Sequence, residues 1–148
     1  MTPAVGARHP KYDAVLSTLR ITPLLAFPLA LFMLGVASSQ GDGWTNAILF
    51  TLGMFSGAQW AVSYGDLFVF GSLLVLFVEV VKSVHTDARA ILNHGLSVMV
   101  ALICVVLFVT SPSFTNSVFF LLITMTMIDV IAGFVITIVA ARRDFGTQ

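Results

Sequence analysis

The sequence predicts an all-α membrane protein: a bundle of four transmembrane helices with a short β-hairpin or interfacial segment between the first and second helices. Three observations predict this fold class. Of the 148 residues, 58% are hydrophobic and 9% are charged, whereas a soluble domain carries about 25% charged residues. Four stretches come close to or reach about 20 apolar residues, the length that a helix needs to cross a bilayer. With four crossings, all seven basic residues fall on one side of the membrane, as the positive-inside rule requires.

The four predicted spans are 21–38, 66–83, 91–110 and 117–140. An amphipathic stretch precedes the first span and is expected to lie at the membrane surface. Pro23 and Pro28 are expected to kink that span, because proline lacks the N–H that a helix interior needs. No secretory signal peptide is recognisable in the polar first residues, so the first span is expected to remain in the protein.

A fifth apolar stretch, residues 47–64, could in principle cross the membrane as well. If it crossed, Lys82 and Arg89 would lie on the opposite side from the basic residues near the N-terminus, against the positive-inside rule. Apolar residues alternate with small or polar ones around Ser56 and Gly57, which is typical of a β-hairpin. A re-entrant or interfacial helix is the alternative. We predict that this segment lies on the outer surface as a hairpin or interfacial cap.

Aromatic and basic residues are placed as interfacial anchors would be. Trp44, Trp60 and Tyr64 are expected to form an aromatic belt at the outer surface, and Arg142 and Arg143 to anchor the cytoplasmic end of the last span.

The second span is expected to begin close to a capping box. Ser63 and Asp66 have the required spacing, and the carboxylate would face the positive end of the helix.

The sequence contains no internal repeat or interdomain linker, so residues 1–148 are interpreted as a single membrane domain. Short connections follow the second and third spans. They predict that the second, third and fourth spans are successive antiparallel neighbours.

Three strings carry a resemblance to known sequences: SGAQWAVSYGDLFVFGSLLVLFVEVVKS, ILNHGLS and FFLLITMTMIDVIAGFVITIVAARRDFG. They resemble a group of small, uncharacterised four-span bacterial inner-membrane proteins, over residues 50–146. The resemblance implies a multi-pass protein of the bacterial inner membrane with cytoplasmic termini. It implies no activity and no site residue.

Two carboxylates fall inside predicted spans, where an ionisable group is costly and therefore marks a candidate site. Asp129 lies about 16 Å from the cytoplasmic end of the last span, and Glu79 about 7 Å from that of the second, at 1.5 Å per residue. Asp129 is the stronger candidate because it lies deeper.

Helical spacing places seven polar or small residues on inward faces of the last three spans. Counted from the cytoplasmic ends, they form two layers. The mid-membrane layer holds Ser72, Cys104 and Asp129, and the layer nearer the cytoplasm holds Glu79, His94, Ser97 and Thr137.

Three interpretations of the two acids stay open. In the first, both acids belong to a structural interior, where Asp129 is neutral or hydrogen-bonded and Glu79 is paired with Lys82, His94 or Arg20. In the second, the two acids form a proton or cation relay. In the third, one acid faces a basic residue of a partner subunit. His85 and His94 both lie near the cytoplasmic surface, which disfavours haem ligation. A single cysteine, Cys104, excludes an intramolecular disulfide, and no cofactor or metal is expected.

Two function classes remain after the charge and the motifs are considered. Seven basic and seven acidic residues give no net charge, which disfavours a nucleic-acid partner. No hydrolase, metalloprotease or phosphate-binding motif occurs, so no catalytic residue is predicted. The first class is a non-enzymatic accessory or structural subunit that binds a membrane-protein partner or itself within the bilayer. The alternative is a small proton- or cation-coupled transporter or channel that uses Asp129 and Glu79.

Overall fold

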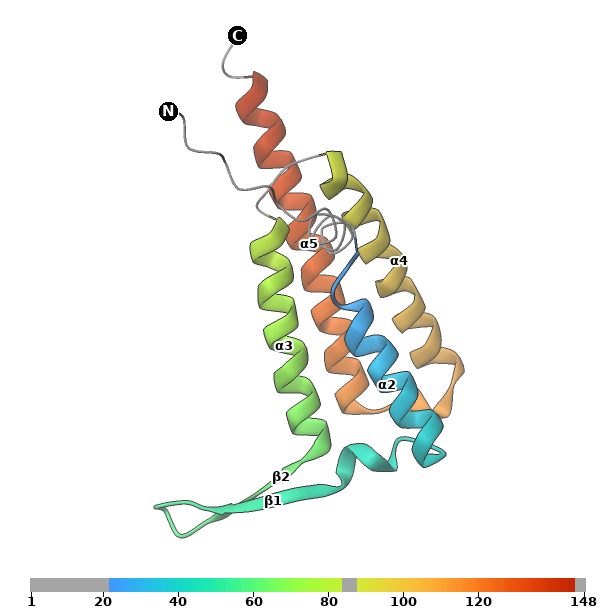
Figure 1. The fold of residues 1–148 in the computed structure, drawn as a ribbon, viewed down its shortest axis with the longest axis vertical. Helices are drawn as coiled ribbons and strands as arrows, with labels where there is room; N and C mark the ends of the chain where they lie inside the picture. The colour runs from blue at the N-terminus through green and yellow to red at the C-terminus, as the bar shows by residue number, and fades with distance from the viewer. Residues whose placement is uncertain (1–21, 84–87, 146–148) are drawn as a thin grey trace, which may run out of the picture.

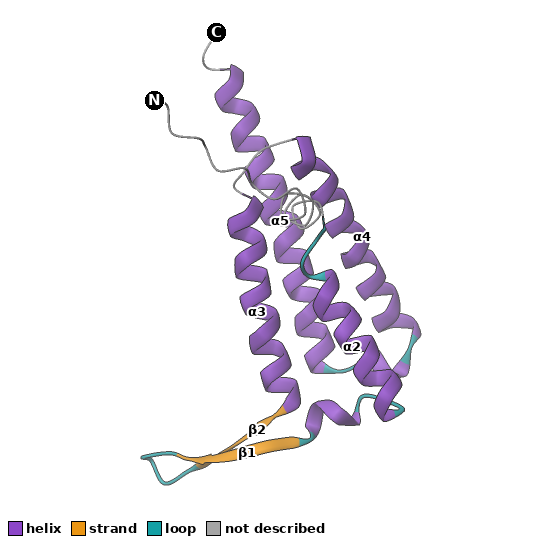
Figure 2. Ribbon diagram, in the orientation of Figure 1, coloured by secondary structure: helices purple, strands orange, loops and turns teal. Residues whose placement is uncertain are grey.

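The computed structural model describes residues 22–83 and 88–145, with side chains described for 22–83 and 92–139. In chain order the elements are α2 (Ala26–Ser39), the 3-10 helix η1 (Gly43–Asn46), β1 (Ile48–Gly53), β2 (Gln59–Ser63), α3 (Tyr64–Ser83), α4 (Ala88–Thr110), the 3-10 helix η2 (Pro112–Phe114) and α5 (Ser117–Phe145). Four helices lie side by side, with a two-stranded hairpin at one end of the bundle (Figures 1 and 2). We call this the hairpin end and the opposite end the far end. The predicted helical class and the hairpin are confirmed.

Three helical segments are long and apolar enough to cross a membrane: Tyr64–Ser83, Leu92–Thr110 and Ser117–Val139. They correspond to the last three predicted spans. The first predicted span contains a shorter helix, α2, which has 14 residues. A helix needs about 20 residues to cross a bilayer.

The two prolines of the first predicted span set the start of α2 and do not kink it. The helix begins at Ala26, after Pro23, and Pro28 lies in its first turn. Proline is tolerated there because the first N–H groups of a helix have no intrahelical partner. The expectation of a kinked helix that begins near residue 21 is therefore wrong, although residue 21 itself lies outside the described part of the chain.

Helix α5 is the centre of the packing, because it runs along both α3 and α4. Helix α2 packs against α4, α5 and η1 and lies in front of α5 in Figure 1. Among the described residues, α3 and α4 are linked mainly through α5 and not by direct packing along their length. The prediction that the second and third spans are packed neighbours needs correction, because α3 and α4 each pack along α5 and meet each other through side chains near the far end.

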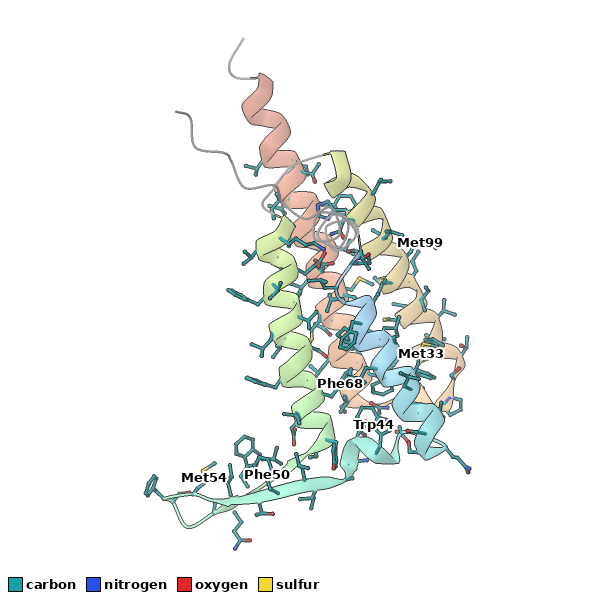
Figure 3. All side chains as sticks on the ribbon, in the orientation of Figure 1. Met33, Trp44, Phe50, Met54, Phe68 and Met99 are labelled. Atoms are coloured by element: carbon teal, nitrogen blue, oxygen red, sulfur yellow. The ribbon has the colours of Figure 1, made fainter. Side chains whose placement is uncertain are left out.

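An aromatic cluster fills the bundle at the hairpin end. Phe32 of α2 is fully buried. Its ring centroid lies 5.2 Å from that of Trp44, 5.5 Å from Phe68, 5.7 Å from Phe114 and 4.8 Å from Phe119. Figure 3 shows Trp44 and Phe68 at the base of the bundle. These rings come from α2, η1, α3, η2 and α5, so one cluster fixes the relative positions of five elements.

Trp44 belongs to this aromatic cluster. A Cβ on Gly35 would come within 2.7 Å of the indole, so the ring lies flat against α2 where only glycine leaves room. The predicted role of Trp44 as an interfacial anchor is not tested by this packing and stays a prediction. Trp60 and Tyr64 are half exposed, and their anchoring role stays a prediction.

The hairpin projects sideways from the base of α3, beyond the helices (Figure 1). Of the two predicted forms, the segment is therefore a hairpin and not a cap over the end of the bundle. Strand partners Phe50–Val62 and Leu52–Trp60 share one face, and Thr51–Ala61 and Gly53–Gln59 share the other. Phe50 and Met54 point toward the side on which the helices stand (Figure 3). The hairpin is therefore amphipathic, as the alternation predicts.

The predicted capping box is present at the start of α3. The Ser63 backbone N–H donates to Asp66 Oδ2 at 2.9 Å, the Ser63 hydroxyl donates to the same oxygen at 2.7 Å, and the Asp66 N–H donates to Ser63 Oγ at 3.1 Å. This reciprocal arrangement satisfies N–H groups that the first helical turn cannot. It fixes the direction in which α3 leaves the hairpin.

Candidate functional site

The predicted polar residues of the spans gather where α3, α4 and α5 meet, toward the far end. Glu79 of α3 is fully buried. Its Oε1 accepts a hydrogen bond from Asn93 Nδ2 of α4 at 2.7 Å. Its Oε2 accepts one from the backbone N–H of Leu24 at 3.0 Å and lies 3.0 Å from Lys82 Nζ. Both carboxylate oxygens are thus satisfied, as a buried charge requires.

Lys82 extends the same network to the segment that precedes α2. Its Nζ donates to the carbonyl oxygen of Thr22 at 2.9 Å and lies 3.4 Å from Asn93 Oδ1. Together, Glu79 and Lys82 hold the backbone at both Thr22 and Leu24. This network, formed by Glu79, Lys82, Asn93 and the backbone of 22–24, is called the Glu79 network below. It locks the beginning of α2 against α3 and α4.

Asp129 of α5 lies beside the Glu79 network but is not part of it. The side chain is buried, with Ser97 of α4 facing it. The side chains of Glu79, Lys82 and His94 lie within electrostatic reach of its carboxyl. Asp129 Oδ2 and Ser97 Oγ meet no strict hydrogen-bond geometry with the described residues, although the Ser97 hydroxyl lies close enough to the Asp129 carboxyl to interact with it. Two buried polar atoms therefore face each other without a well-formed hydrogen bond, which is costly and uncommon.

His94 of α4 is packed against Gly133 of α5, where a Cβ would overlap the imidazole ring. Both ring nitrogens are buried and, within the described part of the chain, have no hydrogen-bond partner. Gly133 lies one helical turn from Asp129 toward the far end. His94 and Ser97 are likewise about one turn apart on α4. The four residues therefore form two neighbouring pairs along the contact between α4 and α5. Asp129 faces Ser97, and Gly133 packs against His94 one turn further toward the far end.

The predicted layers need correction, because Asp129 lies with Ser97 and not with Cys104. Cys104 is fully buried in the apolar core with residues such as Phe32 and Leu122. The error comes from counting inward from residue 140. Helix α5 continues to Phe145 and extends past the far ends of α3 and α4 (Figure 1). Counting from the hairpin end, where the turns are short, places Asp129 and Ser97 about 18 and 20 Å along their helices.

The other predicted site residues lie apart from this cluster. Ser72 is buried and donates to the Phe68 carbonyl of its own helix at 2.8 Å. Thr137 is exposed, and its hydroxyl donates to the Gly133 carbonyl at 2.8 Å. Such bonds satisfy a hydroxyl within its own helix. The side chains of Arg142 and Arg143, and the residues Arg20 and His85, lie outside the described part of the chain.

Sequence reasoning missed two members of the Glu79 network. Asn93 is buried, and its spacing of four from Ser97 could have placed it on the same face of α4. The backbone N–H of Leu24 has no side-chain signal. It is available because it precedes the first turn of α2, where N–H groups lack helical partners.

The chemistry available here is that of hydrogen bonding and proton exchange. Within the described residues, no group of three or more His, Cys, Asp or Glu side chains could hold a metal ion. The Glu79 network is saturated, whereas Asp129, Ser97 and His94 retain unused hydrogen-bonding capacity.

A separate feature is an open apolar groove between α2 and α3. One part, of about 300 Å³, is lined by residues that include Phe27, Leu31, Tyr64, Leu67, Gly71 and Val75. A second part, of about 270 Å³, shares Phe27 and Val75 and continues along α3 to Val78. Large side chains such as Phe32 and Phe68 fill the inner side of this junction. The groove is therefore an outer surface that runs along both helices.

Comparisons with protein-family models, with curated protein sequences and with solved structures find no match to this chain.

Proposed function

We propose that this chain is a small, non-enzymatic accessory subunit that binds a membrane-protein partner through the groove between α2 and α3. The observation that carries the proposal is the floor of that groove. Gly71 lies near the middle of α3, and a Cβ built on it meets nothing within 4 Å. A glycine in a membrane helix usually lets another helix approach closely. Here the approach is open, so the partner is a transmembrane helix.

The Glu79 network supports the accessory function because it uses buried charge to hold helices together. Every polar atom of Glu79 is engaged, so this acid acts as a packing device. Apolar side chains dominate the rest of the described surface, including Phe77, Phe134 and Val109. Such a surface suits lipid and helical partners.

The proposed setting is the bacterial inner membrane, with four crossings and cytoplasmic termini. Helix α2 begins and α5 ends toward the far end, opposite the hairpin (Figure 1). Thr22 and Leu24 are bonded at the level of Lys82 and Glu79, near the end of α3. The segment from Thr22 through α2 therefore traverses the bundle over a length comparable to that of α3.

The experiment is a mild-detergent purification of the tagged chain from its own membranes, with cross-linking and mass spectrometry. We expect one stoichiometric larger partner. Gly71→Leu fills the groove floor without a clash and is expected to abolish its recovery. The matched control is Leu73→Phe, which adds bulk at an exposed position of α3 that does not line the groove. Recovery of the chain alone, or equal loss in both variants, contradicts the proposal.

The alternative function is a small proton- or cation-coupled transporter or channel. It is favoured by the unpartnered Asp129 oxygen and not by Glu79, whose oxygens are engaged. For this alternative, Asp129→Asn is expected to abolish proton-coupled flux in reconstituted vesicles while expression is maintained. Unchanged flux excludes it.

A further inference from the structure

Unsatisfied polar groups concentrate at a single contact inside the bundle. Of five buried side-chain atoms without a hydrogen-bond partner in the described structure, four belong to His94, Ser97 and Asp129, and the fifth is the Trp44 indole nitrogen. Ser97 and Asp129 are each 2% exposed. Buried polar atoms normally find partners, so such a concentration indicates a ligand small enough to fit between packed helices.

The charges around this contact restrict what the ligand can be. On α3, Glu79 and Lys82 form an ion pair and cancel each other. Among the described side chains of α4, His94 is the titratable group near Asp129, and Asn93 is engaged by Glu79. Among those of α5, the titratable group at this contact is Asp129. Helix α2 carries no titratable side chain. Among the side chains that the structure describes, electrical neutrality at this contact therefore depends on Asp129 and His94.

Neutrality requires that Asp129 and His94 together hold one exchangeable proton. If the proton is on histidine, the site contains a buried carboxylate and a buried imidazolium, each with unpaired polar atoms. If the proton is on Asp129, both groups are neutral and only ordinary dipoles are left unpaired. Burial penalises an unpaired charge much more than an unpaired dipole, so the proton belongs on the carboxyl.

We propose that Asp129, with Ser97 facing it and His94 one turn away, is a proton-binding site that is occupied in the resting protein. The Ser97 hydroxyl is the group placed to bond the acid. His94 is the acceptor toward the far end: transfer moves the proton from the carboxyl oxygen to a ring nitrogen and leaves the net charge at zero. The proposal goes beyond the accessory function and does not depend on it.

Infrared spectroscopy of the purified chain in an ester-free detergent tests the site directly, because a protonated carboxylic acid absorbs apart from a carboxylate. Glu79 is the only glutamate in the chain, and Asp129 is one of six aspartates. Carbon-13 labelling of aspartate or of glutamate therefore separates the two acids without any mutation. At neutral pH we expect one acid band that shifts with labelled aspartate and not with labelled glutamate.

Variants then assign the band to a residue. It is expected to vanish in Asp129→Asn and to persist in Asp66→Asn, the control at the start of α3. In Ser97→Ala it is expected to move, because the hydrogen bond to the acid changes. Absence of any acid band, a shift with labelled glutamate, or persistence of the band in Asp129→Asn overturns the proposal. The labelling result stands even where Asp129→Asn fails to fold, and it is independent of partner recovery.

Discussion

At the residue scale, the two buried acids have different roles because their surroundings differ. Glu79 receives two hydrogen bonds and an ion pair, whereas Asp129 keeps an oxygen without a described partner. A buried charge whose hydrogen bonds are all formed holds the helices in one arrangement. A buried acid with an unbonded oxygen is available to exchange a proton. Depth alone, which made Asp129 the stronger candidate, does not reveal this difference.

Removing the cation of the Glu79 network should expose the cost of a buried charge. Lys82→Met leaves the carboxylate with two N–H donors and no counter-charge, and we expect the free energy of unfolding to fall by about 3 kcal/mol. Unfolding in detergent micelles measures it. Adding Glu79→Gln to Lys82→Met should restore part of the loss, because the uncompensated charge is gone. Strictly additive effects of the two substitutions contradict the network.

Gly133 should be intolerant of the smallest enlargement. In Gly133→Ala the new methyl group overlaps the His94 imidazole, and overpacking of this kind costs about 1–3 kcal/mol. Gly71→Ala is the matched control, since a Cβ there meets nothing within 4 Å. Thermal unfolding of both purified variants should separate them. Equal stability of the two would show that His94 does not pack on α5.

At the scale of elements, the hairpin has two faces with different chemistry. Its apolar face carries Phe50, Leu52, Trp60 and Val62, and it projects beyond the helices. A two-stranded hairpin is marginally stable in water alone, and its free backbone edges exclude it from the hydrocarbon centre. We therefore expect the hairpin at the membrane interface, which meets both requirements when the apolar face contacts the acyl chains and the edges contact the headgroups.

Tryptophan fluorescence can measure that position, because the chain has two tryptophans. In Trp44→Phe, only Trp60 remains, and we expect strong quenching by lipids brominated near the headgroup and weak quenching by aqueous acrylamide. The control is Trp60→Phe, in which the packed Trp44 should be protected from both quenchers. Quenching of Trp60 by acrylamide as efficiently as that of free indole would place the hairpin in water.

The elements differ in how far the sequence predicts them. The three long apolar helices, the hairpin and the capping box follow from local patterns of hydrophobicity and spacing, and the structure confirms them. The prediction that α3 packs along α4 and the assignment of Asp129 to the layer of Cys104 are wrong. Both depend on the length of α5 and on its packing against α3 and α4. Local sequence patterns encode neither the length of α5 beyond its neighbours nor this packing.

In the candidate site, too, the sequence predicts some features and not others. Helical spacing correctly places Glu79, His94, Ser97 and Asp129 on interior faces. It does not predict that the Leu24 backbone N–H binds Glu79, since the residue type gives no information about the hydrogen bonds of its backbone. Nor does it reveal that Trp44 packs into the aromatic cluster, because that depends on the space above Gly35. Contacts between distant segments therefore account for most of what the sequence leaves undetermined.

At the scale of the whole molecule, the proposed topology requires α2 to be a fourth crossing. Three helices are long enough to span a membrane unaided. Helix α2 has 14 residues, so it needs the residues before it to reach the far end of the bundle. The Glu79 network holds those residues in place, because it bonds Thr22 and Leu24 at the level of the far end of α3. A short helix can then cross as part of a bundle, since its polar beginning is satisfied by protein and not by lipid.

Cysteine labelling from the two sides of sealed vesicles tests this claim most directly. In a Cys104→Ser background, which removes the only cysteine, Thr2→Cys and Thr147→Cys report the two ends of the chain, and Ser56→Cys and Ser113→Cys report the hairpin end. Four crossings predict that Thr2→Cys and Thr147→Cys react with an impermeant maleimide from the same side, and the two hairpin-end positions from the other. Labelling of Thr2→Cys together with the hairpin-end positions would mean three crossings and would contradict the account.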